Sequence, residues 1–87
     1  MRESAIEKKV CNYASDKGWL AFKCTGIKGV PDRIFHKNGK TFYIEFKREG
    51  GKPTKLQRVF IKRLMEQSIP VFVIDSVEKG VACVDAQ

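Results

Sequence analysis

The stretch that decides the fold is DRIFHKNGKTFYIEFK, residues 32–47. At its centre, Asn38-Gly39 is the strongest short signal for a two-residue β-hairpin turn, because both residue types tolerate positive φ angles. The arm after the turn, from Lys40 to Arg48, alternates in character. One face holds Phe42, Ile44 and Phe46, and the other holds Thr41, Tyr43, Glu45 and Lys47. This alternation predicts a half-buried strand that pairs with a shorter strand from Asp32 to Lys37.

The two ends of this hairpin carry the residues that suggest chemistry. If the arms pair through the turn, Asp32 lies close to Glu45, and Lys47 stands beside Glu45 on the same face. Two carboxylates in one place repel each other and resist burial, and a bound cation relieves both effects. Because Mg²⁺ takes hard oxygen ligands, the pattern predicts a metal site suited to phosphodiester hydrolysis. In such a site Lys47 positions water or offsets negative charge.

Each of these residues also has a simpler interpretation. Glu45 and Lys47 fit a solvated strand face. Asp32 fits the start of a strand after a Pro31 turn. The placement of all three around one tight hairpin favours the metal site over these alternatives.

Outward from the hairpin, apolar spacing and breakers predict the other elements. We expect a helix over 3–17, strands over 19–24, 69–75 and 81–84, a loop over 25–31, a connector over 49–53 and a helix over 54–67. The order α-β-β-β-α-β-β predicts an α/β domain, a mixed sheet flanked by helices. The length of 87 residues predicts one domain, 1–87. Trp19 and Phe22 are large aromatic residues that could stack on the bases of a nucleic acid, but in so small a domain we expect them in the core.

The composition points to a polyanionic partner. Lys and Arg number 17 against 10 Asp and Glu, which gives a net charge of +7. Residues 31–66 carry ten basic and four acidic side chains, so the excess surrounds the hairpin. This charge favours nucleic acid, although an anionic membrane surface has the same sign.

No apolar run approaches the ~20 residues of a spanning helix, and the first residues lack the apolar middle of a signal peptide. We therefore expect an intracellular, cytoplasmic protein. Cys11, Cys24 and Cys83 are odd in number and widely spaced, which predicts neither a disulfide framework nor a zinc site. We expect them to be small buried apolar residues.

The motif Pro31-Asp32, followed by Glu45-Phe46-Lys47 on a strand, resembles the PD-(D/E)xK nuclease superfamily. Glu7 on a leading helix, Gly29-Val30 before the Pro-Asp pair, and Leu56-Gln57 on the following helix make the chain similar to its VRR-NUC (virus-type replication-repair nuclease) family. The resemblance covers nearly the whole chain and implies the restriction-endonuclease-like core. Without attached domains, the chain looks like the stand-alone phage and bacterial members.

The resemblance implies roles for individual residues. Asp32, Glu45 and the backbone carbonyl of Phe46 would bind Mg²⁺, for which Mn²⁺ substitutes, and Lys47 would be the catalytic lysine. Glu7 would close the metal site, and Gln57 would help to orient it. Both have alternatives: Glu7 fits a surface helix acid, with Glu3 one turn away as a substitute, and Thr54-x-x-Gln57 fits a helix capping box.

The resemblance further implies a DNA endonuclease that prefers branched, flapped or four-way-junction DNA and acts as a homodimer. Basic side chains near the site are expected to contact the DNA backbone: Lys28, Arg33, Arg48, Lys52 and Lys55. Two rival interpretations stay open. The first is a basic DNA-binding module of the same fold with an inert site, and the second is an interaction subunit that lends charge to a larger assembly.

Overall fold

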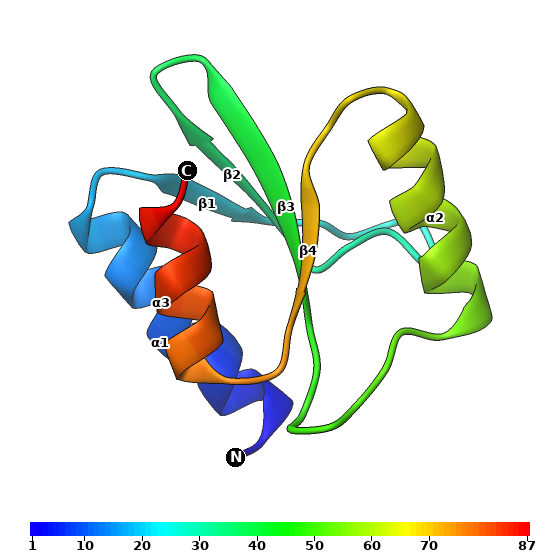
Figure 1. The fold of residues 1–87 in the computed structure, drawn as a ribbon, viewed down its shortest axis with the longest axis horizontal. Helices are drawn as coiled ribbons and strands as arrows, with labels where there is room; N and C mark the ends of the chain where they lie inside the picture. Colours follow the sequence, from blue (N-terminus) through cyan, green and yellow to red (C-terminus); the bar gives the residue numbers. More distant parts are fainter.

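A computed structural model describes the whole chain, residues 1–87. Its elements are α1 (Glu3–Asp16), β1 (Leu20–Lys23), β2 (Arg33–Lys37), β3 (Lys40–Phe46), α2 (Lys55–Glu66), β4 (Val71–Ile74) and α3 (Val77–Asp85). The strands form one sheet of order β1-β2-β3-β4, in which β4 is parallel to β3 and the other neighbours are antiparallel. Helices flank this sheet on both sides (Figure 1). The structure therefore confirms an α/β fold with a mixed sheet.

The hairpin between β2 and β3 forms as the sequence predicts. Asn38 and Gly39 have φ angles of 50° and 79°, and both are positive as a two-residue hairpin turn of type I′ requires. The register pairs Lys37 with Lys40 and Arg33 with Ile44. This register fixes which residues meet at the far end of the hairpin, where the candidate site lies.

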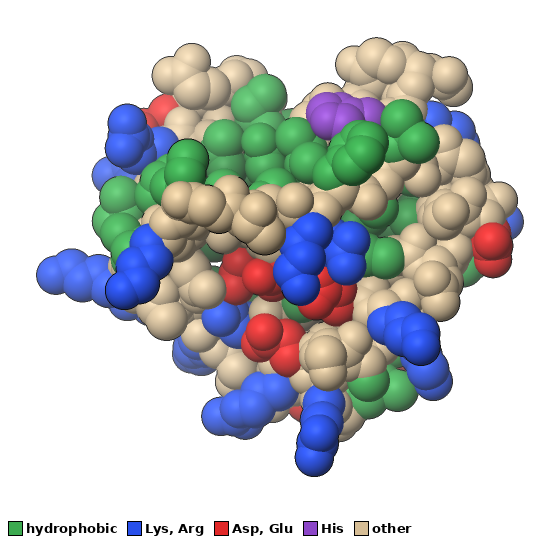
Figure 2. Space-filling model, turned by 180° about the vertical axis from the view of Figure 1, so that it is seen from behind, with side chains coloured by type: hydrophobic (Ala, Val, Ile, Leu, Met, Phe, Trp, Pro, Cys, Tyr) green, Lys and Arg blue, Asp and Glu red, His purple; other side chains and the backbone are tan.

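Helix α2 covers only part of the sheet face that lies opposite α1 and α3 (Figure 1). No residue of α2 is buried. The loop before β2 packs against it at Gly29, whose φ is 87° and where a Cβ would lie 2.7 Å from the Leu56 side chain. The β1 end of the same face stays open, and Leu20 and Phe22 are 60% and 53% exposed there. Figure 2 shows a band of hydrophobic side chains across this side of the molecule.

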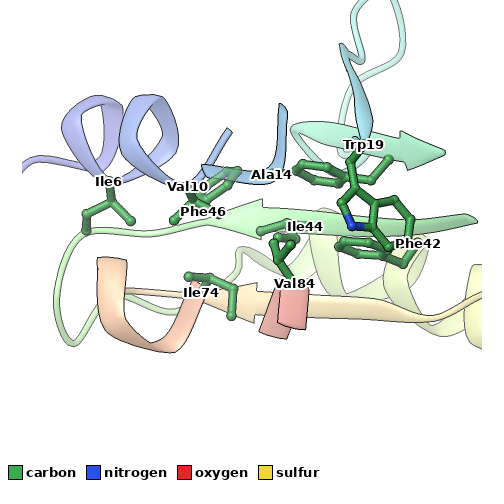
Figure 3. Close-up of a cluster of buried hydrophobic side chains, with 10 residues drawn as sticks. Ile6, Val10, Ala14, Trp19, Phe42, Ile44, Phe46, Ile74 and Val84 are labelled. Atoms are coloured by element: carbon green, nitrogen blue, oxygen red, sulfur yellow. The ribbon is translucent and has the colours of Figure 1, made fainter. Parts of the chain in front are cut away.

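The core lies on the other face of the sheet, under α1 and α3 (Figure 3). Ile6, Val10 and Ala14, spaced four residues apart on α1, are fully buried. They pack in one cluster with the predicted inner face of β3, Phe42, Ile44 and Phe46. Trp19 joins this cluster and is 5% exposed. The prediction of a buried residue is thus confirmed for Trp19 and is wrong for Phe22.

The last predicted element is wrong. Residues 81–84, expected to form a strand, lie within α3. The Ser76 side chain caps this helix by accepting a hydrogen bond from the Lys79 N–H. Gly80 and Val84 face the core, and a Cβ at Gly80 would collide with the Val10 side chain. A four-residue apolar run cannot distinguish a strand from a helix segment, whereas the capping serine and the 80/84 spacing indicate a helix.

The three cysteines are half-buried and form no disulfide. Cys11 and Cys83 pack against the core cluster, in agreement with the predicted role as apolar filler. Burial raises the pKa of the Cys83 thiol to about 11, so this thiol stays protonated at neutral pH. None of the helices combines the length and the apolar character that crossing a membrane requires.

Candidate active site

The β2–β3 register brings Asp32 and Glu45 together. Arg33 pairs with Ile44, so the next residues outward on the two strands, Asp32 and Glu45, lie opposite each other. The backbone N–H of Phe46 donates a 2.7 Å hydrogen bond to Oδ2 of Asp32, which holds this carboxylate against β3. The Asp32 charge also raises the pKa of Glu45. The two acidic groups therefore share one face at the open end of the hairpin.

Glu45 is an unusual residue for a strand face, because it is only 1% exposed. Its Oε2 lies 3.1 Å from Nζ of Lys47, whose side chain is 13% exposed. Its Oε1 is buried and has no hydrogen-bond partner in the protein. A buried carboxylate oxygen without a partner carries a free-energy cost, which a ligand at this position would remove. The solvated strand face considered above does not describe Glu45.

The electrostatics of the pair follow from burial. Burial raises the pKa of Asp32, opposed mainly by the Phe46 N–H and by the charges of Lys47 and Lys23. Burial also raises the pKa of Glu45, reinforced by the charge of Asp32 and opposed by Lys47. Both shifts show that two negative charges are held here at a cost. A divalent cation would favour the ionised form of both groups.

The donor set suits a hard cation of the Mg²⁺ type. Mg²⁺ is bound by one or two carboxylates and completes its shell with water and phosphate oxygens. Asp32 and Glu45 supply the carboxylates, although no group of three or more His, Cys, Asp and Glu side chains is arranged to hold a metal ion. The Tyr43 N–H donates to the carbonyl of Pro70, just before β4, and the Lys47 N–H donates to that of Ile74 on β4. By the alternation of a strand, the backbone groups of Phe46 point to the other side, toward Asp32. The Phe46 carbonyl is thereby directed toward the side where the carboxylates meet.

Glu7 lies near this pair but has its own partner. Its Oε2 accepts a 2.7 Å hydrogen bond from Nε of Arg33, an ion pair between α1 and β2. Its charge still raises the pKa of Asp32, while the charge of Glu3, one turn earlier, raises the pKa of Glu45. Glu3 and Glu7 of α1 therefore both act electrostatically on the site. The structure also ties Arg33 to Glu7, where the sequence suggested only a DNA contact.

Gln57 forms the capping box at the start of α2. The Thr54 N–H donates to Gln57 Oε1 at 2.8 Å, and the Gln57 N–H donates to Thr54 Oγ1 at 3.2 Å. This confirms the alternative that the sequence left open for Gln57. The capping contact does not by itself exclude a second role in the site.

The basic residues around the site are mostly exposed. Lys28, Arg48, Lys52 and Lys55 all lie on the surface. Arg48 and Lys52 line a recess of about 470 Å³ beside Lys47, together with Arg2, Glu3 and Gly51. The Gly50 N–H donates to Asp75 Oδ2 at 3.0 Å, which anchors the connector that carries these cations.

Two basic residues near the site were not predicted from the sequence. Arg2 lies in the recess, and Lys23 lowers the pKa of Asp32. The position of Lys23 in the predicted strand 19–24, just before the loop that leads to Asp32, was the signal that could have identified it, and the structure pairs it with Arg33. Figure 2 shows Lys and Arg side chains around a group of acidic side chains on this face.

Comparison with known proteins places the chain in a family. A protein of Acyrthosiphon pisum secondary endosymbiont phage 1, named "Putative nuclease p44", is 38% identical over 79 residues, which cover 87% of this chain and 85% of that protein. No model of a known protein family matches the chain. The extent and identity of the match show that the chain belongs to the family of this phage protein.

Proposed function

We propose that this chain is a Mg²⁺-dependent DNA endonuclease of the VRR-NUC type. The observation that carries this proposal is the buried, unpartnered Oε1 of Glu45, beside Asp32 and next to the Lys47 amine. The name of the phage relative supports a nuclease, and the basic surface supports a nucleic acid substrate. An intracellular site of action in a bacterial or phage-infected cell belongs to the same proposal.

Asp32, Glu45 and the Phe46 carbonyl would hold the cation, and Glu7 would close the site directly or through water. The bound cation would polarise the scissile phosphate and lower the pKa of the attacking water. The Phe46 N–H keeps one oxygen of Asp32 fixed, so the other oxygen is free to bind. The Lys47 amine, 3.1 Å from Glu45, is placed to orient the water and to offset charge on the phosphate. In this mechanism water attacks phosphorus directly, without a covalent enzyme intermediate.

Lys28, Arg48, Lys52 and Lys55 would hold the DNA backbone by charge, with Arg33 contributing beside Glu7. Such contacts carry little sequence information. The preference for branched, flapped or four-way-junction DNA comes from the family resemblance alone.

A symmetric dimer would supply one site for each strand of such a substrate. Only 14 of 87 residues are buried, so association would add to a small core. The sequence suggested that apolar residues late in the chain form an extended sheet edge through which two copies associate: Val71, Phe72, Val73, Ile74, Val81 and Val84. Val81 and Val84 belong to α3, so among these residues only those of β4 lie at an edge of the sheet. Sedimentation showing a monomer at micromolar concentration would contradict the dimer.

One cleavage experiment tests the activity. Labelled duplex, flap and four-way-junction DNA are incubated with the protein in Mg²⁺, in Mn²⁺ or in chelator. Wild type is compared with Lys47→Ala, Asp32→Ala and the control Lys9→Ala, which removes an exposed α1 lysine with no assigned contact. The proposal predicts metal-dependent cutting that both site variants lose and the control keeps. Binding without cutting would support the inert DNA-binding module, and equal cutting by all variants would assign the activity elsewhere.

A further inference from the structure

The open part of the sheet face beside the candidate site has no role in the proposed function so far. Its residues point away from α1 and α3: Leu20 and Phe22 on β1, Ile34 and His36 on β2, and Thr41 and Tyr43 on β3. Phe22 is 53% exposed and Leu20 is 60% exposed. The ring centroids of Phe22 and His36 lie 6.2 Å apart. Exposed aromatic rings on a small domain indicate a binding surface more than a packing role.

The Phe22–His36 pair is held in a defined orientation. His36 Nδ1 and Thr41 Oγ1 share a hydrogen bond of 2.8 Å, which fixes the imidazole on the sheet surface. The register pairs Phe22 with Ile34 and Leu20 with His36, so the exposed side chains stand on regular backbone and not on a loop. The two rings are inclined by 54° to each other, and an exposed ring held on a sheet in this way is suited to stacking against a planar ligand.

The surface is continuous with the site. Phe22 pairs with Ile34, which lies two residues from Asp32 on β2 and on the same face. Strand geometry then places the backbone of Phe22 roughly 8 Å from that of Asp32. This distance is short on the scale of a nucleic acid strand, since successive nucleotides already rise by about 3.4 Å in a duplex and an unpaired strand can extend further. A base close to the bound phosphate would therefore reach the Phe22 ring.

Charge favours a nucleic acid as the occupant of this surface. Lys23, the next residue on β1, points to the other face of the sheet with its partner Arg33, but it is exposed at the site end of the strand and its charge lowers the pKa of Asp32. In Figure 2, Lys and Arg side chains lie between the hydrophobic band and the acidic group. A purely apolar interface would not need cations along its border with the site, whereas a DNA strand with stacked bases and a charged backbone needs both.

We propose that the Phe22–His36 surface stacks unpaired bases of the DNA strand whose phosphate lies at Asp32 and Glu45. In a duplex each base face is covered by its neighbours, so only an unpaired base can use this surface. The inference rests on the proposed nuclease function. It adds that the substrate has unpaired nucleotides next to the scissile phosphate, as a flap or a branch has.

The test measures DNA binding in chelator, so that no cleavage occurs. Fluorescence anisotropy compares a labelled single strand, the same strand carried as a flap, and a blunt duplex, with wild type, Phe22→Leu, Phe22→Tyr and Val59→Ala. Val59 is the control because it is an apolar residue of α2 that is 46% exposed. We expect Phe22→Leu to weaken single-strand and flap binding on the order of tenfold and to leave duplex binding unchanged. Phe22→Tyr, which keeps the ring, and Val59→Ala should bind like wild type.

Three results overturn the inference. In the first, Phe22→Leu binds all three DNAs like wild type, and in the second it weakens binding to all three equally. In the third, sedimentation shows that Phe22→Leu converts a dimer to a monomer. The last result would make this surface an interface between copies of the chain. The nuclease proposal is judged separately. If Phe22→Leu weakens only single-strand and flap binding but the protein cuts none of these DNAs, the stacking is supported and the nuclease proposal is contradicted. If the protein cuts DNA in a metal-dependent way but Phe22→Leu does not selectively weaken single-strand and flap binding, only the stacking is contradicted.

Discussion

Oδ2 of Asp32 accepts a 2.7 Å hydrogen bond from the backbone N–H of Phe46, so the residue just before β2 is fixed to the end of β3. This contact closes the open end of the hairpin at the point where Glu45 is buried. The other oxygen of Asp32 accepts no hydrogen bond from the protein. Asp32 and Phe46 are fourteen residues apart in the chain, with the Asn38-Gly39 turn between them. The hydrogen bond joins the two ends of the hairpin, so the turn and the pair of carboxylates belong to one structural unit.

Loss of either carboxylate should separate binding from cleavage. In Asp32→Asn or Glu45→Gln, we expect turnover to be lost while DNA binding in chelator is kept or tightened. The physical reason is that each change removes a negative charge that repels phosphate. Gel-based cleavage and fluorescence anisotropy measure the two properties. Clearly weaker binding of both variants in chelator would contradict this charge argument.

The raised pKa of Asp32 predicts a pH-dependent effect on stability. Because the folded pKa is raised above the ordinary value of 3.8, the protonated group favours folding at low pH, and this contribution is lost as the pH rises through the folded pKa. At neutral pH the ionised group therefore opposes folding. We expect Asp32→Asn to raise the Tm by a few degrees at neutral pH, and the difference to shrink below the ordinary pKa.

Thermal melts from acidic to neutral pH measure this difference. Asp16→Asn on the exposed end of α1 is the matched control, and its Tm difference should stay small. A Tm of Asp32→Asn that falls below wild type at neutral pH would show that Asp32 stabilises the fold in its charged form.

Metal binding should be visible without any DNA. A ligand that binds only the folded state raises the free energy of unfolding, by about 2.7 kcal/mol at 100 times its Kd. We therefore expect Mg²⁺ to raise the Tm of wild type and to leave the Tm of Glu45→Gln unchanged. Differential scanning fluorimetry with Mg²⁺ and with matched ionic strength of Na⁺ makes the comparison. An equal shift in both proteins would mean that Mg²⁺ binds elsewhere.

The two interpretations of Gln57 can be separated through its capping partner. Thr54→Ala and Gln57→Ala should each lower stability by about 0.5–2 kcal/mol, because each breaks the capping box of α2. If Gln57 also helps to orient the site, as the family resemblance implies, Gln57→Ala alone should lower the cleavage rate at temperatures where both variants are folded. Equal cleavage by the two variants would leave Gln57 as a cap only.

Helix α3 depends on the close approach that Gly80 allows. A Cβ at this position would collide with Val10, so Gly80→Ala should lower the free energy of unfolding by about 1–3 kcal/mol, despite the better helix propensity of alanine. Urea denaturation measures the change. Ala82→Gly, on the exposed side of the same helix, controls for propensity alone. A Gly80→Ala protein more stable than wild type would show that α1 and α3 can move apart without cost.

The sequence predicted the parts of the fold that local patterns encode. Asn38-Gly39 sets the hairpin turn, and the alternation of β3 sets its buried face, so together they predict that Asp32 meets Glu45. The strand predicted over residues 81–84 is wrong because an apolar run this short does not distinguish a helix from a strand. Their helix is defined by the Ser76 cap and by packing on α1, and the packing is a tertiary contact.

In the candidate site, too, local patterns predicted some contacts and tertiary packing determines the others. The pairing of Asp32 with Glu45 follows from register, whereas the Glu7–Arg33 ion pair joins residues 26 positions apart on different elements and leaves no local signal. The exposure of Phe22 was also beyond local pattern. Residues 19–22 form an apolar run in which no alternation marks an exposed face, and the position of α2 over the other end of the sheet leaves the Phe22 ring uncovered.

The most direct test of the site is the anomalous scattering of Mn²⁺ in crystals of the free protein. We predict one strong peak between the carboxylates of Asp32 and Glu45, on the side of β3 to which the Phe46 carbonyl points. A fully loaded crystal with no peak there, or with manganese bound only at other residues, would contradict the proposal that these two acidic groups share an ion.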